Sequence, residues 1–341
     1  METETIEKRY QQALAPSERL IADMAKLDGD LILLGVAGKM GPDLARLARR
    51  AWDAAGHPDR KVIGVSRFSD PQTREALESD GVQTIAADLL DDAALAALPD
   101  VPNVIYMAGH KFGTAGNESF TWAMNTYLPG RVADQYRNAR IVVFSSGNIY
   151  PFLPAASGGA CEKVAPEPIG EYAQSCLGRE RIFEYHALKN KTPMVIYRLN
   201  YANDVSYGVL VEIARAVREE RPINLDMGNV NVLWQADANE YALRSLLQCT
   251  YPPRVLNITG PETSSVRWLA HEFGGLFGKQ AIFEGEEEPT ALLNNAAESF
   301  RLFGYPNVSL KEMIQLIAEW LKADKPLLNK PTHFQERKGK F

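Results

Sequence analysis

The feature that most constrains this fold is a short apolar run followed directly by three evenly spaced glycines. Residues 31–34 are all leucine or isoleucine, and Gly35, Gly38 and Gly41 follow them. A strand can turn sharply into a helix where no Cβ atom blocks the turn, and the exposed backbone amides and helix N-terminus suit a pyrophosphate. The pattern predicts a phosphate-binding turn, with glycines that serve close packing alone as the alternative.

Further apolar segments have the length and spacing of buried strands, and segments with helical periodicity separate them. They cover residues 61–67, 83–90, 103–109 and 140–146. Five strand–helix repeats predict an α/β fold, a Rossmann-type doubly wound parallel sheet with a smaller C-terminal substrate lobe. The expected divisions are an N-terminal helical extension over 1–29, a Rossmann domain over 30–200 and about 233–260, a substrate lobe over about 201–232 and 261–325, and a tail over 326–341.

The extension before the first strand carries a helical stripe of apolar residues. Leu20, Ile21, Met24 and Leu27 recur at helical spacing and end before Gly29. This stripe predicts a helix that packs on the sheet edge or on a partner subunit.

Charge and composition narrow the possible partners. The chain of 341 residues has 37 Lys and Arg against 43 Asp and Glu, a net charge of −6, which argues against a nucleic-acid surface. No apolar run approaches the roughly 20 residues of a membrane span, so we expect a cytoplasmic protein without membrane contact. Cys161, Cys176 and Cys249 lie far apart, which suits a reducing compartment and predicts no metal site.

The end of the second strand bears on which dinucleotide is bound. Ser66 and Arg67 stand where an acidic residue would accept the ribose hydroxyls of NAD, and Lys39 adds a positive charge in the glycine turn. Two cations favour the 2′-phosphate of NADP, and NAD is the alternative. Asp88 after the third strand is placed to face the adenine, and small residues at 108–109 leave room for a ribose.

Taken together, these features make the chain resemble the extended short-chain dehydrogenase/reductase family, in the branch that contains nucleotide-sugar epimerases and dehydratases. The resemblance covers roughly residues 30–322. The residues that carry it are Gly35, Gly38, Gly41, Asp88, Leu89, Ala108, Gly109, Asn125, Ser145, Ser146, Ile149, Tyr150, Tyr172, Arg198, Leu199, Asn200, Asn257, Ile258, Gly260, Pro261, Glu262 and Thr263. It implies an NAD(P)-dependent oxidoreductase that transfers hydride at a hydroxyl or carbonyl of a sugar or nucleotide sugar.

The same resemblance implies roles for individual residues. Ser146 would hold the substrate oxygen, Tyr172 would be the acid/base, and Asn200 would contact the small-molecule substrate. The helices that carry Asn125 and Tyr172 would form a homodimer interface. The expected cofactor-binding residues are Gly35, Gly38, Lys39, Met40, Gly41, Ser66, Arg67, Asp88, Leu89, Ala108, Gly109, Asn125 and Tyr172.

One departure from the family pattern bears on the chemistry. The family has Lys four residues after the catalytic Tyr, where its charge lowers the pKa of the phenol, but this chain has Cys176. Three interpretations follow. Lys111 or His110 supplies the missing assistance, Cys176 is itself reactive, or catalysis is lost and the chain is a dinucleotide-binding protein with a binding or regulatory role.

Overall fold

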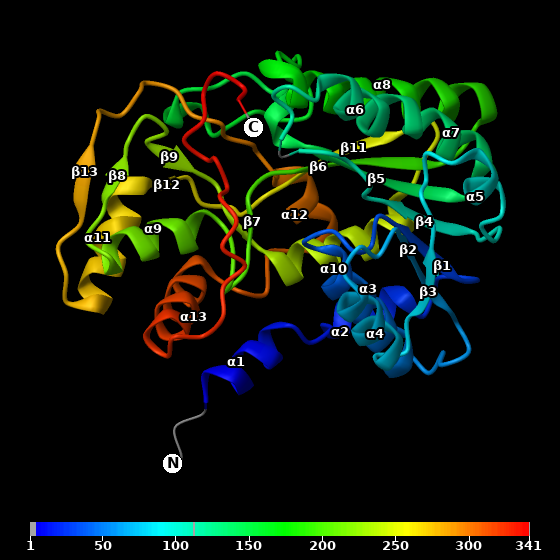
Figure 1. Cartoon of the computed structure of the whole chain (residues 1–341), viewed down its shortest axis with the longest axis horizontal. Helices are drawn as coiled ribbons and strands as arrows, with labels where there is room; N and C mark the ends of the chain where they lie inside the picture. Colours follow the sequence, from blue (N-terminus) through cyan, green and yellow to red (C-terminus); the bar gives the residue numbers. More distant parts are fainter. Residues whose placement is uncertain (1–4, 112, 341) are drawn as a thin grey trace.

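A seven-stranded parallel sheet forms the centre of the computed structural model, which describes residues 5–111 and 113–340 (Figure 1). Its order is β11-β6-β5-β4-β1-β2-β3, so the order reverses between β1 and β4. The strands are β1 Leu31–Leu34, β2 Val62–Ser66, β3 Gln83–Ala86, β4 Asn103–Tyr106, β5 Arg140–Ser146, β6 Met194–Leu199 and β11 Arg254–Ile258. This confirms the predicted doubly wound fold, in which ligands bind beyond the carboxyl ends of the strands at the reversal point.

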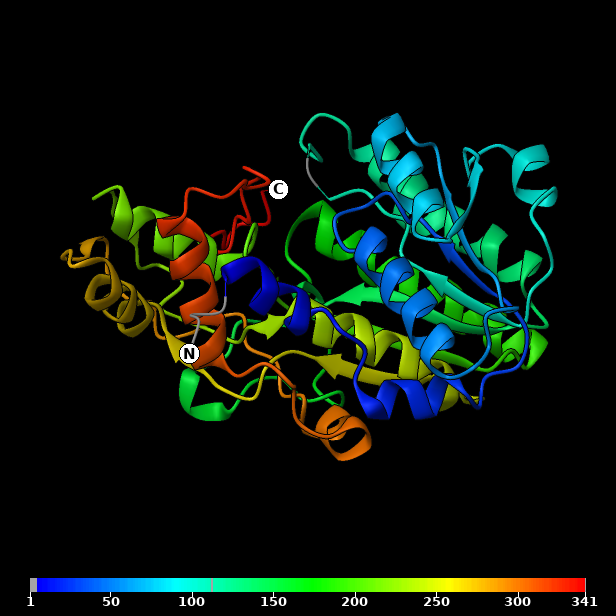
Figure 2. The same cartoon turned by 90° about the horizontal axis from the view of Figure 1, so that it is seen from below.

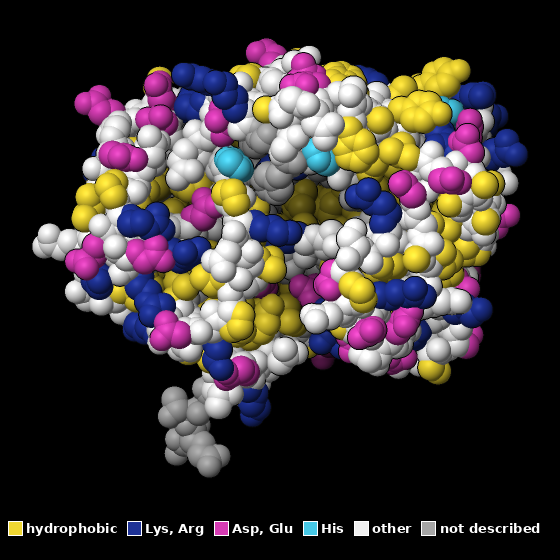
Figure 3. All heavy atoms as spheres, viewed as in Figure 1, with side chains coloured by type: hydrophobic (Ala, Val, Ile, Leu, Met, Phe, Trp, Pro, Cys, Tyr) yellow, Lys and Arg dark blue, Asp and Glu magenta, His cyan; other side chains and the backbone are white. Residues whose placement is uncertain are grey.

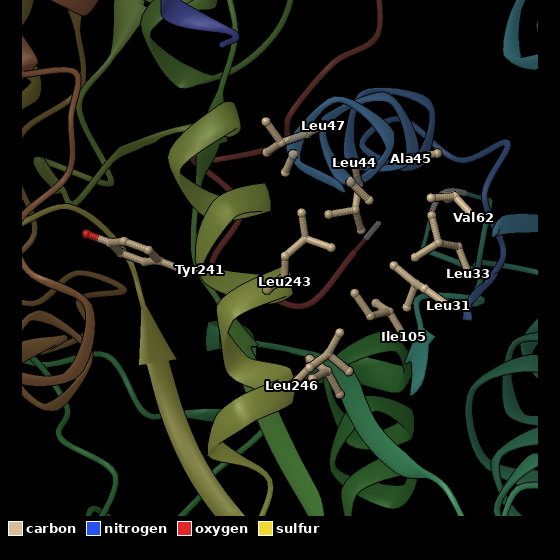
Figure 4. Close-up of a cluster of buried hydrophobic side chains, with 14 of the residues drawn as sticks. Leu31, Leu33, Leu44, Ala45, Leu47, Val62, Ile105, Tyr241, Leu243 and Leu246 are labelled. Atoms are coloured by element: carbon tan, nitrogen blue, oxygen red, sulfur yellow. The ribbon is translucent and has the colours of Figure 1, made fainter. Parts of the chain in front are cut away.

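Helices cover both faces of the sheet, because alternate side chains of each strand point to opposite faces. One face packs on α2 (Glu18–Met24), α3 (Gly41–Ala54), α4 (Pro71–Ser79) and α10 (Gln235–Ser245). The other face packs on α5 (Asp92–Ala96), α7 (Leu128–Gln135) and α8 (Gly170–Asn190). Figure 4 shows Leu44 of α3 and Leu243 of α10 directed towards Leu31 of β1.

A second lobe with its own apolar core lies beside the carboxyl ends of the strands (Figures 1 and 2). Short two-stranded sheets pair β10 with β7, β12 with β9 and β13 with β8. Its helices are α9 (Val209–Arg218), α11 (Val266–Phe277) and α13 (Leu310–Lys322). The short strands are β7 Ala202–Asn203, β8 Pro222–Asn224, β9 Asn229–Val230, β10 Leu233–Trp234, β12 Ser264–Ser265 and β13 Ile282–Glu284. The chain enters this lobe after β6, returns to the sheet for α10 and β11, and enters it again.

Two helices precede β1 in the described chain, where the sequence predicted one. The expected stripe forms α2, and its Leu20 and Met24 are buried against the sheet core of the same chain. The additional helix, α1 (Ile6–Ala13), reaches the second lobe. There the ring of Tyr10 lies edge-on to Trp234, with 6.2 Å between ring centroids, and its Oη donates to Asp204 Oδ2 at 2.8 Å. The N-terminal segment therefore packs both lobes together.

The tail after α13 is irregular but firmly anchored on the second lobe, on the side that faces the sheet (Figures 1 and 2). Phe334 is buried in the second-lobe core, and Arg337 Nη1 donates to the Thr290 carbonyl at 2.7 Å. Farther on, Gly339 packs directly on Gly170, the first residue of α8. The tail thus links the second lobe to the helix that carries Tyr172.

Within residues 5–111 and 113–340, no helix has both the length and the apolar character that crossing a membrane requires.

Candidate active site

The glycine turn lies at the reversal point of the sheet and is tightly packed. Gly35 has φ +97°, and a Cβ there would lie 2.7 Å from the backbone N of Ala108, so the ends of β1 and β4 approach closely. A Cβ on Gly41 would overlap the carbonyl of Val36. Gly38, in contrast, is exposed, and a Cβ there would meet only the Gly35 carbonyl oxygen, at 3.4 Å. The first and third glycines close the turn, and the second leaves its backbone open.

A cavity of about 300 Å³ lies between this turn, the ends of β4, β5 and β6, and the second lobe. Figure 3 shows a hollow with an apolar floor at the junction of the lobes. The tail contributes Thr332 to its wall. The predicted site residues that line the cavity are Gly35, Gly38, Lys39, Met40, Gly109, His110, Lys111, Ser146, Tyr172 and Asn200.

Other residues predicted to bind the cofactor lie outside this cavity. Ser66 ends β2, Arg67 follows it, and Asp88 follows β3, at the same edge of the sheet as the glycine turn. Asp88 Oδ1 accepts from the Leu90 amide at 3.0 Å, which stabilises the turn after β3. The side chain of Leu89 is buried in the sheet core, so that only its backbone is available to a cofactor. Gly41 and Ala108 act through the close packing described above.

Asn125, also predicted to bind the cofactor, has a fully buried side chain in a π-helical turn, Ala123–Tyr127. Its Nδ2 donates to the His110 carbonyl at 2.8 Å and to Ser175 Oγ at 2.9 Å, and its Oδ1 accepts from the His110 amide at 2.8 Å. Asn125 therefore fixes the loop after β4 against α8.

Ser146 and Tyr172 meet at the cavity. Ser146 ends β5 and Tyr172 is in the first turn of α8, so the strand end and the helix start bring the two hydroxyls together. The Ser146 and Cys176 side chains lie close enough to Tyr172 to affect the pKa of its phenol. Burial and the Cys176 thiol raise the pKa of Tyr172, while Arg179 and Ser146 act in the opposite direction. The phenol of Tyr172 therefore holds its proton at neutral pH.

The two predicted helpers of Tyr172 are placed differently. Lys111 Nζ lies 5.6 Å from the centroid of the Tyr172 ring, and burial lowers the pKa of Lys111 to about 8. His110 turns towards α6 (Glu118–Trp122), where its Nδ1 lies 3.1 Å from Thr121 Oγ1. Burial and the charge of Arg67 lower the pKa of His110. Lys111 is therefore the predicted helper that faces the phenol.

Cys176 takes the position of the family's Lys but has the environment of a core residue. Its side chain is fully buried with Ile149 and Tyr150. Burial raises the pKa of the Cys176 thiol, which disfavours the thiolate that a reactive cysteine needs.

Sequence reasoning missed Arg179, which also lines the cavity. It lies seven residues after Tyr172, two helical turns along the same face of α8. This spacing is the sequence feature that could have indicated its place at the site. Its Nη1 donates to the Phe144 carbonyl at 2.8 Å and its Nη2 to Asn125 Oδ1 at 2.7 Å.

Lys39 crosses the cleft from the glycine turn to the second lobe. Its Nζ donates to the Ala202 carbonyl at 3.0 Å and lies 4.2 Å from the centroid of the Tyr207 ring. Burial lowers the pKa of Lys39 to about 7, and Lys111 adds repulsion, while Asp204 and Asp43 oppose the shift. The charge of Lys39 therefore changes near neutral pH.

A buried polar network lies behind the cavity and joins the ends of β5, β6 and β11. Arg198 and Glu180 form an ion pair with Nη2–Oε2 at 2.7 Å, and Ser145 Oγ donates to Glu180 Oε1 at 2.5 Å. Arg198 Nη1 also donates to Tyr150 Oη, which in turn donates to Asn257 Oδ1 at 2.9 Å. Arg198, Tyr150 and Asn257, which the sequence suggested separately, therefore form one unit that positions the strand ends.

No protein-family model and no curated protein sequence matches the chain. Solved structures, however, share its architecture. The UDP-glucuronic acid 4-epimerase of Bacillus cereus, in complex with NAD, aligns with a TM-score of 0.70 and 17% identity, over 86% of this chain and 99% of that chain. The UDP-glucose 4-epimerase of Thermus thermophilus, in complex with NAD, aligns with a TM-score of 0.70 and 16% identity, over 86% of this chain and 99% of that chain. The UDP-glucose 4-epimerase of Thermotoga maritima, with UDP-glucose, aligns with a TM-score of 0.68 and 14% identity, over 86% of this chain and 99% of that chain. The chain therefore has the fold of the nucleotide-sugar epimerases, as its resemblance to extended short-chain dehydrogenases/reductases predicted.

Proposed function

We propose that the chain is an NAD(P)-dependent oxidoreductase of the epimerase/dehydratase type, acting on a hydroxyl or carbonyl of a sugar or nucleotide sugar. The observation that carries the proposal is that one cavity is lined by the glycine turn and by both Ser146 and Tyr172. The solved structures with this fold include complexes with NAD and with UDP-sugars, which supports the same ligand classes here.

The residues around the glycine turn fit a dinucleotide. The open backbone at Gly38 and the N-terminus of α3 suit its pyrophosphate, and Lys39 adds a positive charge beside it. Arg67 is exposed at the end of β2, which supports a 2′-phosphate and hence NADP over NAD. The bound nicotinamide would supply the hydride acceptor or donor.

Residues of the chain itself would transfer the proton. Ser146 Oγ would hydrogen-bond the reacting oxygen of the substrate. Tyr172 Oη would give its proton to that oxygen when a carbonyl is reduced and take it back when a hydroxyl is oxidised. The raised pKa of Tyr172 suits the acid direction, and the base direction needs a positive charge near the phenol.

The alternative is a dinucleotide-binding protein that has lost catalysis. Cys176 in place of Lys supports it, because a neutral thiol cannot stabilise a phenolate. The presence of Ser146 and Tyr172 in one cavity supports an enzyme, since a pair without a role in catalysis would not need to meet there.

Turnover tests the proposal. Purified protein is incubated with UDP-glucose or UDP-glucuronic acid and NADP or NAD, and both nicotinamide absorbance and interconversion of the sugars are followed. We expect turnover that Tyr172→Phe reduces by about 100-fold or more, since a positioned acid/base contributes about 10²–10⁴-fold. Tyr185→Phe is the matched control, because Tyr185 is on the exposed face of the same helix. Nucleotide binding without any turnover would favour the alternative, and unchanged turnover in Tyr172→Phe would remove the proton-transfer role.

A further inference from the structure

The environment of Tyr172 contains a positive charge that the family pattern does not provide for. Cys176 stands one helical turn after Tyr172, and its side chain is fully buried as a neutral thiol. The stripe that begins with Tyr172 and Cys176 continues to Arg179, because residues at i, i+4 and i+7 share one face of a helix. The guanidinium of Arg179 reaches the wall of the same cavity as Tyr172.

The guanidinium of Arg179 is held in one place. The Phe144 carbonyl accepts from Nη1 and Asn125 Oδ1 accepts from Nη2, so β5 and the π-helical turn hold it from two sides. Gly109 leaves room for it, because a Cβ at residue 109 would overlap Nη2. An Arg side chain that is 6% exposed is thus fixed by two acceptors and by a glycine beside it.

We propose that Arg179 is a positioning residue that supplies, from two turns along α8, the fixed positive charge beside Tyr172 that Cys176 lacks. This inference rests on the proposed role of Tyr172 in proton transfer. It also revises the sequence-based interpretation, which looked for the charge only in the loop after β4.

The groups that face Tyr172 from the packed elements explain the choice of Arg179 over Lys111. They are Cys176 and Arg179 on α8, Ser146 at the end of β5, and Lys111 in the loop after β4. Of the positively charged groups among the described residues, Arg179 has the largest effect on the pKa of Tyr172 and lowers it. Lys111 also loses charge more easily, since burial lowers its pKa to about 8, whereas neighbouring groups raise the pKa of Arg179 despite its burial.

The test measures the ionisation of residue 172 directly, without substrate or cofactor. 2,3,5-Trifluorotyrosine, whose phenol is more acidic than that of tyrosine, is incorporated at position 172, and its pKa is determined by ¹⁹F NMR. The variants are Arg179→Gln, Gly109→Ala, which displaces the guanidinium without removing its charge, and Lys111→Gln, which removes the other nearby charge. Arg179→Lys is the conservative variant.

We expect Arg179→Gln to raise the pKa at position 172 by about one unit or more, since an opposite charge nearby lowers a pKa by about 1–3 units. Gly109→Ala should raise it by a smaller amount, and Arg179→Lys should restore most of the wild-type value. Lys111→Gln should change it by only a few tenths of a unit.

A larger rise in Lys111→Gln than in Arg179→Gln would overturn the proposal and assign the charge to Lys111. If Arg179→Gln does not fold, Gly109→Ala and Lys111→Gln decide, because the proposal requires the pKa to rise in the first and to change little in the second. The pKa is measured without turnover. The proposed role of Arg179 can therefore be refuted while the proposed oxidoreductase activity stands, and the activity can be refuted while the role of Arg179 stands.

Discussion

Lys39 is the residue whose charge should make nucleotide binding depend on pH. Burial lowers its pKa to about 7, so the amine is mostly neutral above that value, and an anionic ligand would raise the pKa again. By linkage, we expect the affinity for NADPH to fall by up to about tenfold for each pH unit as the pH rises above 7. Fluorescence titration between pH 6 and 9 measures this dependence. Lys39→Gln should remove the decrease in NADPH affinity that is centred near pH 7. The control Lys26→Gln, at an exposed lysine, should show the same decrease as wild-type protein. A pH profile unchanged by Lys39→Gln would show that Lys39 does not contact the nucleotide.

Glu180 does not line the cavity, but its replacement should lower the stability of the protein strongly. Its pair with Arg198 is buried, with side chains 4% and 6% exposed, so Glu180→Gln leaves an uncompensated buried charge. We expect the free energy of unfolding, measured in urea, to fall by about 3–5 kcal/mol. Glu298→Gln breaks the exposed pair with Arg301 and should cost less than about 1 kcal/mol. Equal effects of the two variants would contradict the structural role of the buried pair.

At the scale of elements, the C-terminal tail should behave as part of the second lobe. Phe334 is 1% exposed in the core of that lobe, although no helix or strand holds it. Phe334→Ala should lower the free energy of unfolding by about 3–5 kcal/mol, whereas Leu328→Ala, at a residue 46% exposed, should have little effect. Hydrogen exchange should also show protection of the Thr332 amide, which donates to Glu212. Rapid exchange there, with an unaffected Phe334→Ala, would show a loosely attached tail.

The elements also show how far sequence reasoning reached. The strands, the glycine turn and the meeting of Ser146 with Tyr172 were predictable, because strand periodicity is local and parallel strand ends meet at one edge. The hydrogen bonds of Asn125 with the His110 carbonyl and with Ser175 were not, because they join residues far apart in sequence. The role of the tail depends on contacts between residues far apart in sequence, such as Gly170 with Gly339. Arg179 could have been found from its spacing on α8, but its partners could not.

At the scale of the whole molecule, we expect a homodimer through the helices that carry Asn125 and Tyr172. Large apolar side chains are exposed there: Tyr127, Tyr185 and Leu188 are 61%, 59% and 48% exposed. Figure 3 shows apolar side chains gathered over the α7–α8 side of the molecule. Tyr185→Glu should convert the dimer to a monomer in analytical ultracentrifugation, because a buried unpaired charge disfavours association. Tyr305→Glu, at an exposed tyrosine of another surface, is the control. A monomeric wild-type protein would refute this prediction.

A fluorescence titration of the protein with NADPH and with NADH tests most directly whether the glycine turn holds a dinucleotide. Wild-type protein should bind both, NADPH more tightly. Gly38→Asp should weaken both by about tenfold or more, because a carboxylate would enter the space left by Gly38 and repel the pyrophosphate. Gly275→Ala, at a helical glycine with open space around it, should bind as wild type does. If wild-type protein binds neither nucleotide, or if Gly38→Asp binds them unchanged, the glycine turn does not hold a dinucleotide and the proposed function fails.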